Sequence, residues 1–497
     1  MIARTVVFLG AIALTACAVG PNYHKPSAPV PQAFKEAQGW KPAEPRDAAS
    51  GTAWWSVYDD ATLDGLEKQI DVSNQTLKSS EASWRQAVAL VSQARAGLFP
   101  TVGASASATR SRGTAIETSG GTTTVTGIAT TQASHPVNEF NLAGTASWDL
   151  DIWGKIRRTI EGDVASAQAS EADLAAARLS LQGMLASDYL QLRVADEQRQ
   201  LLEQTVDAYK RALQITQNQY NVGIVAKTDV ITAETQLEGA QSQEINIGVT
   251  RATLEHAIAV LVGKPPADFS LASATLGSAV PVAPTGVPSS LLERRPDIAA
   301  AERQMKAANA QIGVAVAAYF PDLTLNGSYG FASNVVSHLV SSPNNLWSVG
   351  ATAADTLLDF GARSAQVREA RAAYDGTVAN YRQTVLSAFQ QVEDELATLR
   401  ILEQQVQVQD QAVKSANLAA QLTLNQYKAG TVAYTSVVTA QTIALGDAVT
   451  LLTLRQTRLT ASVALIQALG GGWDAASLGS SDGTAAKLAA QEATQDP

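Results

Sequence analysis

The sequence contains a single cysteine, Cys17, so no disulfide bond can form within the chain. Its histidines lack the spacing of metal ligands, and the chain has no Gly-rich phosphate loop and no nucleophile motif. The four histidines are His24, His135, His256 and His338. Acidic pairs such as Glu293 and Asp297 are typical of a solvated helix face. We therefore expect no catalytic residue, no metal ion and no cofactor, and we expect that the chain is not an enzyme.

Positive charge and long apolar runs are also scarce. Charged residues make up 16% of the chain, and the net charge is −10. A nucleic-acid-binding protein would show a basic stripe, so this balance argues against a nucleic-acid partner. A membrane-spanning helix needs about 20 consecutive apolar residues. No such run is evident after the N-terminal segment, and we expect no membrane-spanning helix.

The N-terminal segment has the layout of a secretory signal. Residues 1–16 carry Arg4 and then a short apolar run. The run ends in small residues before Cys17, which is typical of a bacterial lipobox and predicts a lipid on that cysteine. Ala18 follows, and in the lipoproteins that this segment resembles an Asp there favours the inner membrane, so Ala18 favours the outer membrane. A lipid anchors a protein to one leaflet and does not make it a channel.

Proline is absent from two long blocks, 137–264 and 344–496. Six prolines fall in residues 21–45, and six more fall in residues 265–296. Because a proline inside a helix costs about 3 kcal/mol, the two blocks are expected to be helical. The expected segments are a signal peptide (1–16), a lipid anchor and extended leader (17–59), a first repeat (60–264), a Pro-rich linker (265–295), a second repeat (296–473) and a disordered tail (474–497).

The two blocks contain the same stretch of sequence. Gln217–Gln236 reads QNQYNVGIVAKTDVITAETQ, and Leu424–Ile443 reads LNQYKAGTVAYTSVVTAQTI. Eleven of the twenty positions are identical in register, 207 residues apart. Trp153-Gly154 matches Phe360-Gly361 at the same spacing. The chain is therefore interpreted as a tandem duplication.

Each half also contains a pair of alternating segments. In Pro321–Ala332, and again in Glu139–Ile152, apolar and polar side chains alternate with period two. Thr101–Thr109 and the segment that starts at Trp347 alternate as well. These patterns predict four strands in two hairpins, at about 99–152 and 320–358. Such strands match a transmembrane β-barrel, although a soluble sheet packed on a core predicts the same alternation.

Long helices flank the predicted strands and favour the barrel. Ile156–Gln217 and Ala362–Leu424 would each reach about 90 Å if continuous. Asp60–Ala96 and Pro296–Ala317 also read as helices. Helices of such length are typical of coiled coils rather than of globular domains. Their Ala-rich interiors and polar faces indicate helices that line an aqueous duct.

The repeated stretch lies where each long helix ends. Gly223 and Gly430 stand where a helix stop needs a left-handed residue. Thr228 and Thr435 stand as candidate N-caps of the returning helix. The pattern predicts one tight helical hairpin in each half, at the far end from the strands. The simplest interpretation is that these glycines and threonines only make the turn.

Four strands are too few for one chain to close a barrel. An open sheet edge cannot lie in lipid, because its backbone groups would lack hydrogen-bond partners. The chain is therefore expected to assemble with copies of itself, and closed cyclic symmetry is the usual solution. Three copies give twelve strands, whereas two give eight, a barrel filled by its own side chains.

Three short motifs carry a resemblance to a known family. They are CAVGPNY at 17–23, ERRPDI at 293–298 and LGGGW at 469–473. Together they resemble the TolC-like outer-membrane efflux proteins, in the lipoprotein branch that serves RND-type multidrug pumps. The resemblance covers nearly all of residues 17–473. It implies a mainly α-helical homotrimer with a twelve-strand transmembrane β-barrel and a long periplasmic α-helical barrel.

The resemblance also implies partners and a location. It implies an outer-membrane protein that extends through the periplasm, contacts outer-membrane lipid, and meets a periplasmic adaptor protein. That adaptor connects to an inner-membrane RND-type pump, which supplies the energy. The implied function is a passive exit duct for small molecules, since a wide aqueous bore has no apolar pocket to select a ligand. Two alternatives remain: the duct of a type I protein secretion system, and a periplasmic coiled-coil scaffold without a pore.

The resemblance further implies an aperture at the helical tips. Relatives often carry acidic residues just past the second turn, where this chain has Ser436 and Thr439. Asp229 supplies an acid at the matching site of the first copy, Tyr427 keeps the tyrosine before the glycine, and Tyr220 repeats it. The aperture candidates are Tyr220, Gly223, Asp229, Tyr427, Gly430, Ser436 and Thr439. We hypothesise that closure depends on helix packing and on hydrogen bonds around Tyr427, Asp229 and threonine side chains.

Overall fold

The computed structural model describes residues 18–36, 53–112, 114–115, 132–133, 136–275 and 291–478. The predicted signal peptide, Cys17 with its lipid, and the tail beyond residue 478 lie outside the described residues, as do positions 276–290 of the Pro-rich linker. Contacts divide the chain into two compact units, and each is described by itself. The first contains residues 1–24, 87–166 and 305–376, and the second contains the remainder.

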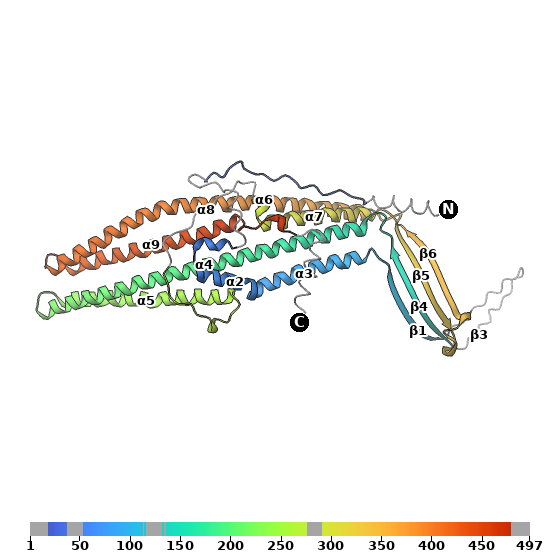
Figure 1. Ribbon diagram of the computed structural model, residues 1–497, viewed down its shortest axis with the longest axis horizontal. Helices are drawn as coiled ribbons and strands as arrows, with labels where there is room; N and C mark the ends of the chain where they lie inside the picture. Colours follow the sequence, from blue (N-terminus) through green and yellow to red (C-terminus); the bar gives the residue numbers. More distant parts are fainter. Residues whose placement is uncertain are drawn as a thin grey trace. The chain divides into compact units, whose positions relative to one another are not determined.

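The first unit holds a four-stranded antiparallel sheet. Its strands are β1 (Thr101–Ser111), β4 (Val137–Asp149), β5 (Asp322–Ser333) and β6 (Asn345–Ala354). They lie side by side in the order β1-β4-β5-β6, so the two predicted hairpins join through β4 and β5 (Figure 1). A short separate pair is formed by β2 (Thr114–Ala115) and β3 (Gln132–Ala133). The prediction of four main strands in two hairpins is confirmed.

One face of this sheet carries polar side chains that bond across strands. The Ser147 hydroxyl donates to Oδ1 of Asn326 at 3.1 Å. The Thr324 hydroxyl donates to Oδ1 of Asp149 at 2.9 Å. Both pairs lie directly opposite each other in the β4–β5 register. The period-two alternation read from the sequence therefore places the polar residues on one face, as predicted.

The other face is apolar and exposed. Trp148 lies opposite Leu325 in the β4–β5 register. Val102 on β1 is 80% exposed, and Val349 on β6 is 81% exposed. A soluble sheet packed on a core would bury these side chains. A large exposed apolar surface instead marks a region that meets lipid or another protein.

Two equivalent glycines return the chain from the sheet to the long helices. Gly154 has φ of 80° and Gly361 has φ of 94°, a conformation that favours glycine. The Trp153 ring stacks on Phe320 with 4.7 Å between centroids. Its Nε1 donates to the backbone oxygen of Pro321 at 2.9 Å. The Trp153-Gly154 motif thus fixes the bend that follows β4.

The helices of the two halves correspond in length. Helices α4 and α8 have 67 residues each, and α5 and α9 have 35 each. The α-helices are α2 (Ala61–Ser73), α3 (Gln75–Ala96), α4 (Lys155–Asn221), α5 (Lys227–Leu261), α6 (Leu291–Arg294), α7 (Pro296–Ala317), α8 (Ala362–Lys428) and α9 (Tyr434–Ala468). The 3-10 turns are η2 (Trp54–Tyr58), η3 (Pro266–Asp268), η5 (Val336–His338), η6 (Ser342–Asn344) and η7 (Ala475–Ser477). Equal lengths fit the interpretation of a duplicated chain.

The prediction of one helix over residues 60–96 is wrong at one position. Asn74 ends α2 in an extended conformation, and α3 begins directly after it. Its side-chain oxygen accepts from the backbone N–H of Leu77 at 2.9 Å, and its Nδ2 donates to the backbone oxygen of Leu261 at 2.8 Å. An asparagine that caps the next helix and bonds a distant segment interrupts a helical pattern that its neighbours would continue.

The second unit has an apolar core to which α2, α3, α4, α5 and α9 contribute. Leu63 of α2, Leu185 of α4, Ile258 of α5 and Val463 of α9 are all fully buried in one cluster. Burial of a leucine or isoleucine side chain stabilises a fold by about 1.5–3 kcal/mol. This cluster holds both repeats together, because α2, α4 and α5 belong to the first repeat and α9 to the second.

Helix α9 contradicts one expectation from the sequence. By length and composition alone, Tyr434–Ala468 is apolar enough to cross a membrane, and 17% of its most apolar window is buried. The expectation that no helix is apolar and long enough to span a membrane is therefore wrong by the criteria of length and composition. Leu459 and Val463 of this helix belong to the core of the second unit, so part of its apolar surface packs against the other helices.

Candidate functional site at the two helical turns

The same backbone turn is built twice, once between α4 and α5 and once between α8 and α9 (Figure 1). Gly223 has φ of 78° and Gly430 has φ of 72°. The N–H of Ile224 donates to the oxygen of Gln219 at 2.8 Å, and the equivalent bond from Thr431 measures 3.0 Å. These are the bonds of a helix that ends on a left-handed glycine. The prediction of a left-handed glycine at the end of both long helices is confirmed, and their place at an aperture stays a prediction.

The predicted N-caps are wrong in both copies. The N-cap residues are Ala226 and Ala433, and neither makes a side-chain cap bond. Thr228 and Thr435 lie inside the first turn of α5 and α9 instead. The glycine turn sets the point at which the returning helix begins, and that point comes before either threonine.

The two equivalent tyrosines lie in different environments. Tyr427 is 3% exposed, whereas Tyr220 is 42% exposed. The Tyr427 hydroxyl donates to Oγ1 of Thr216 on α4 at 3.3 Å. Thr216 is fully buried and donates in turn to the backbone oxygen of Ala212 at 3.0 Å. The second turn is thereby attached to the first long helix.

A second tyrosine completes this contact and was not singled out by sequence reasoning. Tyr434 is 1% exposed, and its ring meets the Tyr427 ring edge-on with 5.2 Å between centroids. Ala233 and Val437 complete the buried cluster. The position equivalent to Tyr434 in the first copy is Lys227. The replacement of a charged residue by an aromatic one at this position of the repeat was the signal that could have identified Tyr434.

The environment of the cluster raises the pKa of both phenols above the ordinary tyrosine value. Burial raises the pKa of Tyr434 to about 12, with smaller contributions from Tyr427, Tyr209 and Asp229. Burial also raises the pKa of Tyr427, opposed by the hydrogen bond with Thr216 and assisted by the charge of Asp229. The pair therefore acts as neutral hydrogen-bonding and packing groups near pH 7.

The structure brings some of the predicted aperture residues together and leaves others apart. Asp229 is half-buried in the first turn of α5 and close enough to influence Tyr427. Ser436 and Thr439 lie exposed on α9, and the Thr439 hydroxyl donates to the backbone oxygen of Thr435 at 2.9 Å. The direct partner of Tyr427 is a threonine, but one on α4 rather than one in the turns.

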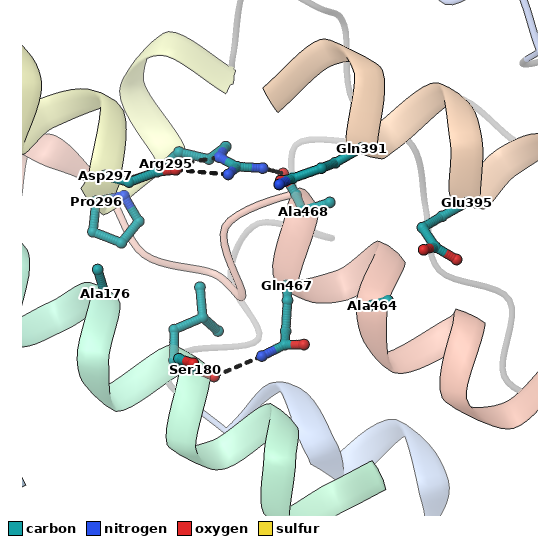
Figure 2. A pocket seen from close by; sticks show the side chains of 11 residues that line it. Ala176, Ser180, Arg295, Pro296, Asp297, Gln391, Glu395, Ala464, Gln467 and Ala468 are labelled. Atoms are coloured by element: carbon teal, nitrogen blue, oxygen red, sulfur yellow. Dashed lines mark hydrogen bonds and ion pairs between the residues drawn. The ribbon is translucent and has the colours of Figure 1, made fainter. Parts of the chain in front are cut away.

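A cavity of about 440 Å³ lies in the second unit at the start of α7 (Figure 2). Arg295 is buried there and forms a two-point contact with Asp297, at 3.0 and 2.7 Å. Its remaining terminal nitrogen donates to the backbone oxygen of Ala468 at 3.0 Å. Gln467 Nε2 donates to the backbone oxygen of Leu179 on α4 at 3.0 Å. These bonds fasten the end of α9 to α4 and to the start of α7.

The same place explains two of the sequence motifs. Gly470 has φ of 93°, and a methyl group there would overlap the backbone oxygen of Arg294. Only glycine therefore allows the LGGGW segment to lie against the ERRPDI segment. On the far side of the cavity, burial raises the pKa of Glu395, with a further contribution from Asp394. The hydrogen bonds of Arg295 and Gln467 at this cavity join helices of the second unit to one another.

Metal binding has no support in the part of the chain that the structure describes. Within those residues no group of three or more His, Cys, Asp or Glu side chains could hold a metal ion. The lipid predicted on Cys17 lies outside the described residues and stays a prediction.

Known proteins resemble this chain in both sequence and architecture. The family model described as outer membrane efflux protein matches residues 66–264 and 287–471. The probable efflux pump outer membrane protein TtgC of Pseudomonas putida is 29% identical over 93% of this chain and 94% of its own length. The pyoverdine export outer membrane protein OpmQ of Pseudomonas aeruginosa is 30% identical over 86% of this chain and 89% of its own.

The solved structure of the outer-membrane channel OprN has the same fold. It is 28% identical in sequence, with a TM-score of 0.83 over 92% of this chain and all of that one. The mainly helical fold with a four-stranded sheet and two long helical hairpins is thus a known channel architecture. With a family model matching most of its length, the chain belongs to the outer membrane efflux protein family.

Proposed function

We propose that three copies of this chain form the exit duct of a tripartite efflux pump. As a member of its family the chain is an outer-membrane efflux protein. In the proposal, small molecules leave passively through a barrel that crosses the outer membrane and a helical duct that crosses the periplasm. A periplasmic adaptor meets the helical tips, and an inner-membrane RND-type pump supplies the energy.

The observation that carries the proposal is the sheet of the first unit. It has four strands, with β1 and β6 at its edges, an exposed apolar face and an opposite polar face. An edge left open in lipid would cost several kcal/mol for each unpaired backbone group. Copies that pair β1 of one protomer with β6 of the next would remove both edges. Three copies supply twelve strands and leave an aqueous bore.

The helices support a duct of periplasmic length. At 1.5 Å per residue, α4 and α8 with 67 residues each reach roughly 100 Å. Such helices cannot be buried in a single globular core. A ring of them with polar faces inward provides a wet passage that continues from the barrel.

Small molecules are the cargo that the relatives favour. TtgC is named as an efflux pump component, and OpmQ is named for pyoverdine export. A strain that lacks this chain is expected to become sensitive to exported compounds while its secreted proteins are unchanged. Loss of a secreted protein with unchanged drug sensitivity would favour the type I secretion alternative.

The direct test measures mass and conductance on the same sample. Purified full-length protein in detergent is expected to have the mass of a trimer by native mass spectrometry and to conduct ions in a planar bilayer. A monomer that does not conduct would remove the duct proposal. A conducting trimer would exclude the scaffold without a pore.

We further propose that Tyr427 and Asp229 help to hold the aperture shut. The contacts between Tyr427, Thr216 and Tyr434 support this role, because they fix the second turn against α4. Asp229→Ala and Tyr427→Phe are each expected to raise single-channel conductance. Tyr319→Phe, which alters an exposed tyrosine of the first unit, serves as the control. Unchanged conductance in both variants would remove the proposed role.

A further inference from the structure

The first helical turn exposes a side chain that the second turn buries. The Tyr427 hydroxyl donates to Thr216 on α4, and Ile215 packs against the same buried cluster. These two residues, together with Ala212, whose backbone oxygen accepts from Thr216, are here named the first socket. Ala212 and Thr216 are buried, and Ile215 is half-buried. Tyr220 stands at the position equivalent to Tyr427 and remains exposed.

The repeat also duplicates the socket. Shifting its positions by 207 residues gives Ala419, Leu422 and Thr423 on α8, here named the second socket. The side chains are an alanine, an aliphatic residue and a threonine in both sockets. Leu422 is nevertheless 53% exposed, and Ala419 is exposed as well. The second socket therefore repeats the three kinds of side chain of the first, and two of them, Ala419 and Leu422, are exposed while Thr423 is half-buried.

Within one chain, Tyr427 contacts the first socket, whereas, among the residues that the structure describes, Tyr220 and the second socket are not in contact with a tyrosine or socket of the other half. The contact of Tyr427 joins the second hairpin to the first hairpin of the same chain. We call each contact between neighbouring helical hairpins a joint. In a closed ring the first hairpin (α4 and α5) alternates with the second hairpin (α8 and α9). The joint that follows must therefore connect the first hairpin of one copy to the second hairpin of a neighbouring copy. That joint requires a tyrosine on α4 and a socket on α8, which are the two features left exposed.

We propose that the second socket binds Tyr220 of the partner subunit, with its hydroxyl donating to Thr423. This inference rests on the proposed trimeric duct, because only a closed ring of copies brings the two surfaces together. It assigns the joint between copies to named residues, Tyr220 on α4 and the second socket on α8. Each copy offers one tyrosine and one socket, so the contact repeats around the ring without a free end.

The joint between copies differs from the joint inside a chain at one position. Lys227 replaces Tyr434, so Tyr220 lacks the ring that meets Tyr427 at 5.2 Å. Lys227 is exposed in this structure, and a flexible charged side chain does not bury itself as an aromatic ring does. We infer that the joints between copies are the weaker ones and separate first when the aperture opens.

Thiol cross-linking tests the assignment. The Thr216→Cys/Tyr427→Cys variant places two thiols across the contact seen within the chain. Bis-maleimides of increasing length are tested on this variant, and the shortest one that links the two thiols is chosen. The same reagent is then applied to the Tyr220→Cys/Thr423→Cys variant in full-length, detergent-purified protein. Tyr220→Cys and Thr423→Cys alone serve as controls for reaction at any other site, Cys17 included.

Denaturing gels separate the outcomes. The first double variant is expected to stay at monomer mass, whereas the second is expected to form covalent dimers and trimers. A sample with the native mass of a trimer whose second double variant stays monomeric on the gel would overturn this inference and leave the proposed duct intact. A sample with the native mass of a monomer would overturn the duct proposal, and this inference with it.

Discussion

The two helical turns of this protein have the same backbone but different surroundings. Both end on a left-handed glycine with the same pattern of backbone bonds. The second turn buries Tyr427 and Tyr434 in a shared cluster, while the first leaves Tyr220 and Lys227 exposed. The comparison shows that the turn and its contacts are specified separately. Glycine sets the geometry, and the residues beside it decide which neighbour the turn binds.

The comparison also shows how a duplicated chain can make unequal joints. Perfectly repeated hairpins would give identical contacts within and between copies. Here Tyr434 and Lys227 occupy equivalent positions and break that identity. An aromatic pair contributes about 0.5–1.5 kcal/mol beyond its buried area, which is enough to make one joint open before the other. The following predictions test this inequality, from the largest effect to the smallest.

The largest difference is expected between Tyr427→Ala and Tyr220→Ala. Removing the buried ring of Tyr427 leaves a cavity and is expected to cost about 3–5 kcal/mol of local stability. Tyr220→Ala is expected to cost less local stability than Tyr427→Ala. The difference is expected to be at least the contribution of the contact between the Tyr427 and Tyr434 rings, about 0.5–1.5 kcal/mol. Hydrogen exchange at the two turns measures both losses. Equal losses in the two variants would mean that the joints are equivalent.

The glycines of the turns are expected to behave alike. Gly223→Ala and Gly430→Ala each place a side chain in the left-handed region, which costs about 1–2 kcal/mol. Gly239→Ala and Gly446→Ala are matched controls, because both glycines lie within helices with open space around them. The controls are expected to stabilise their helices by up to about 1 kcal/mol. Hydrogen exchange measures the change in local stability in all four variants. Destabilisation by both turn variants and stabilisation by both control variants would support the left-handed conformation of Gly223 and Gly430.

Sequence reasoning succeeds where the cause is local. The absence of proline and the alternation of side chains predicted the long helices and the four strands, because each pattern follows from the geometry of one element. The left-handed glycines were predicted for the same reason. The break at Asn74 was missed because its cause includes a bond to Leu261, which is 187 residues away.

The candidate site was predicted less completely. Tyr427 was identified from its place in the repeat, but its bond to Thr216 depends on how α8 lies against α4. Tyr434 was missed because its importance appears only when two helices meet. The threonine caps were wrong because the turn, rather than the side chain, sets the first residue of the returning helix.

Alkaline pH should affect the second turn through Tyr434. Its pKa is raised from 10.0 in a free chain to about 12, so the protonated phenol favours the folded state. This contribution is complete below pH 10 and is lost as pH rises through about 12. Tyrosinate absorbance of the protein minus that of Tyr434→Phe is expected to give a midpoint near 12. A difference titration centred near 10 would show that the ring is solvated.

The smallest effect is expected for a bond next to the cluster. Gln236 Nε2 donates to Oε1 of Gln441 at 3.4 Å, a long bond between α5 and α9. In the joint between copies, Ile443 takes the position of Gln236 and Glu234 takes the position of Gln441. An isoleucine side chain cannot form this hydrogen bond. Gln236→Ala is expected to cost about 0.5 kcal/mol through this long bond. Because Gln236 also bonds the Tyr209 side chain on α4, the substitution acts within the first hairpin as well. A loss above 2 kcal/mol in hydrogen exchange would place this bond among the main contacts instead.

The inequality of the two joints is tested most directly by exchanging the residues that cause it. Lys227→Tyr gives the joint between copies its missing ring, and Tyr434→Lys removes the ring from the joint within the chain. Lys227→Met is the control that removes the charge without adding a ring. The measurement is single-channel conductance of each purified variant in a planar bilayer. We expect the conductance of Lys227→Tyr to be lower than that of Lys227→Met. We expect the conductance of Tyr434→Lys to be higher than that of the unmodified protein. A conductance of Lys227→Tyr at or above that of Lys227→Met, with an unchanged conductance of Tyr434→Lys, would contradict the account.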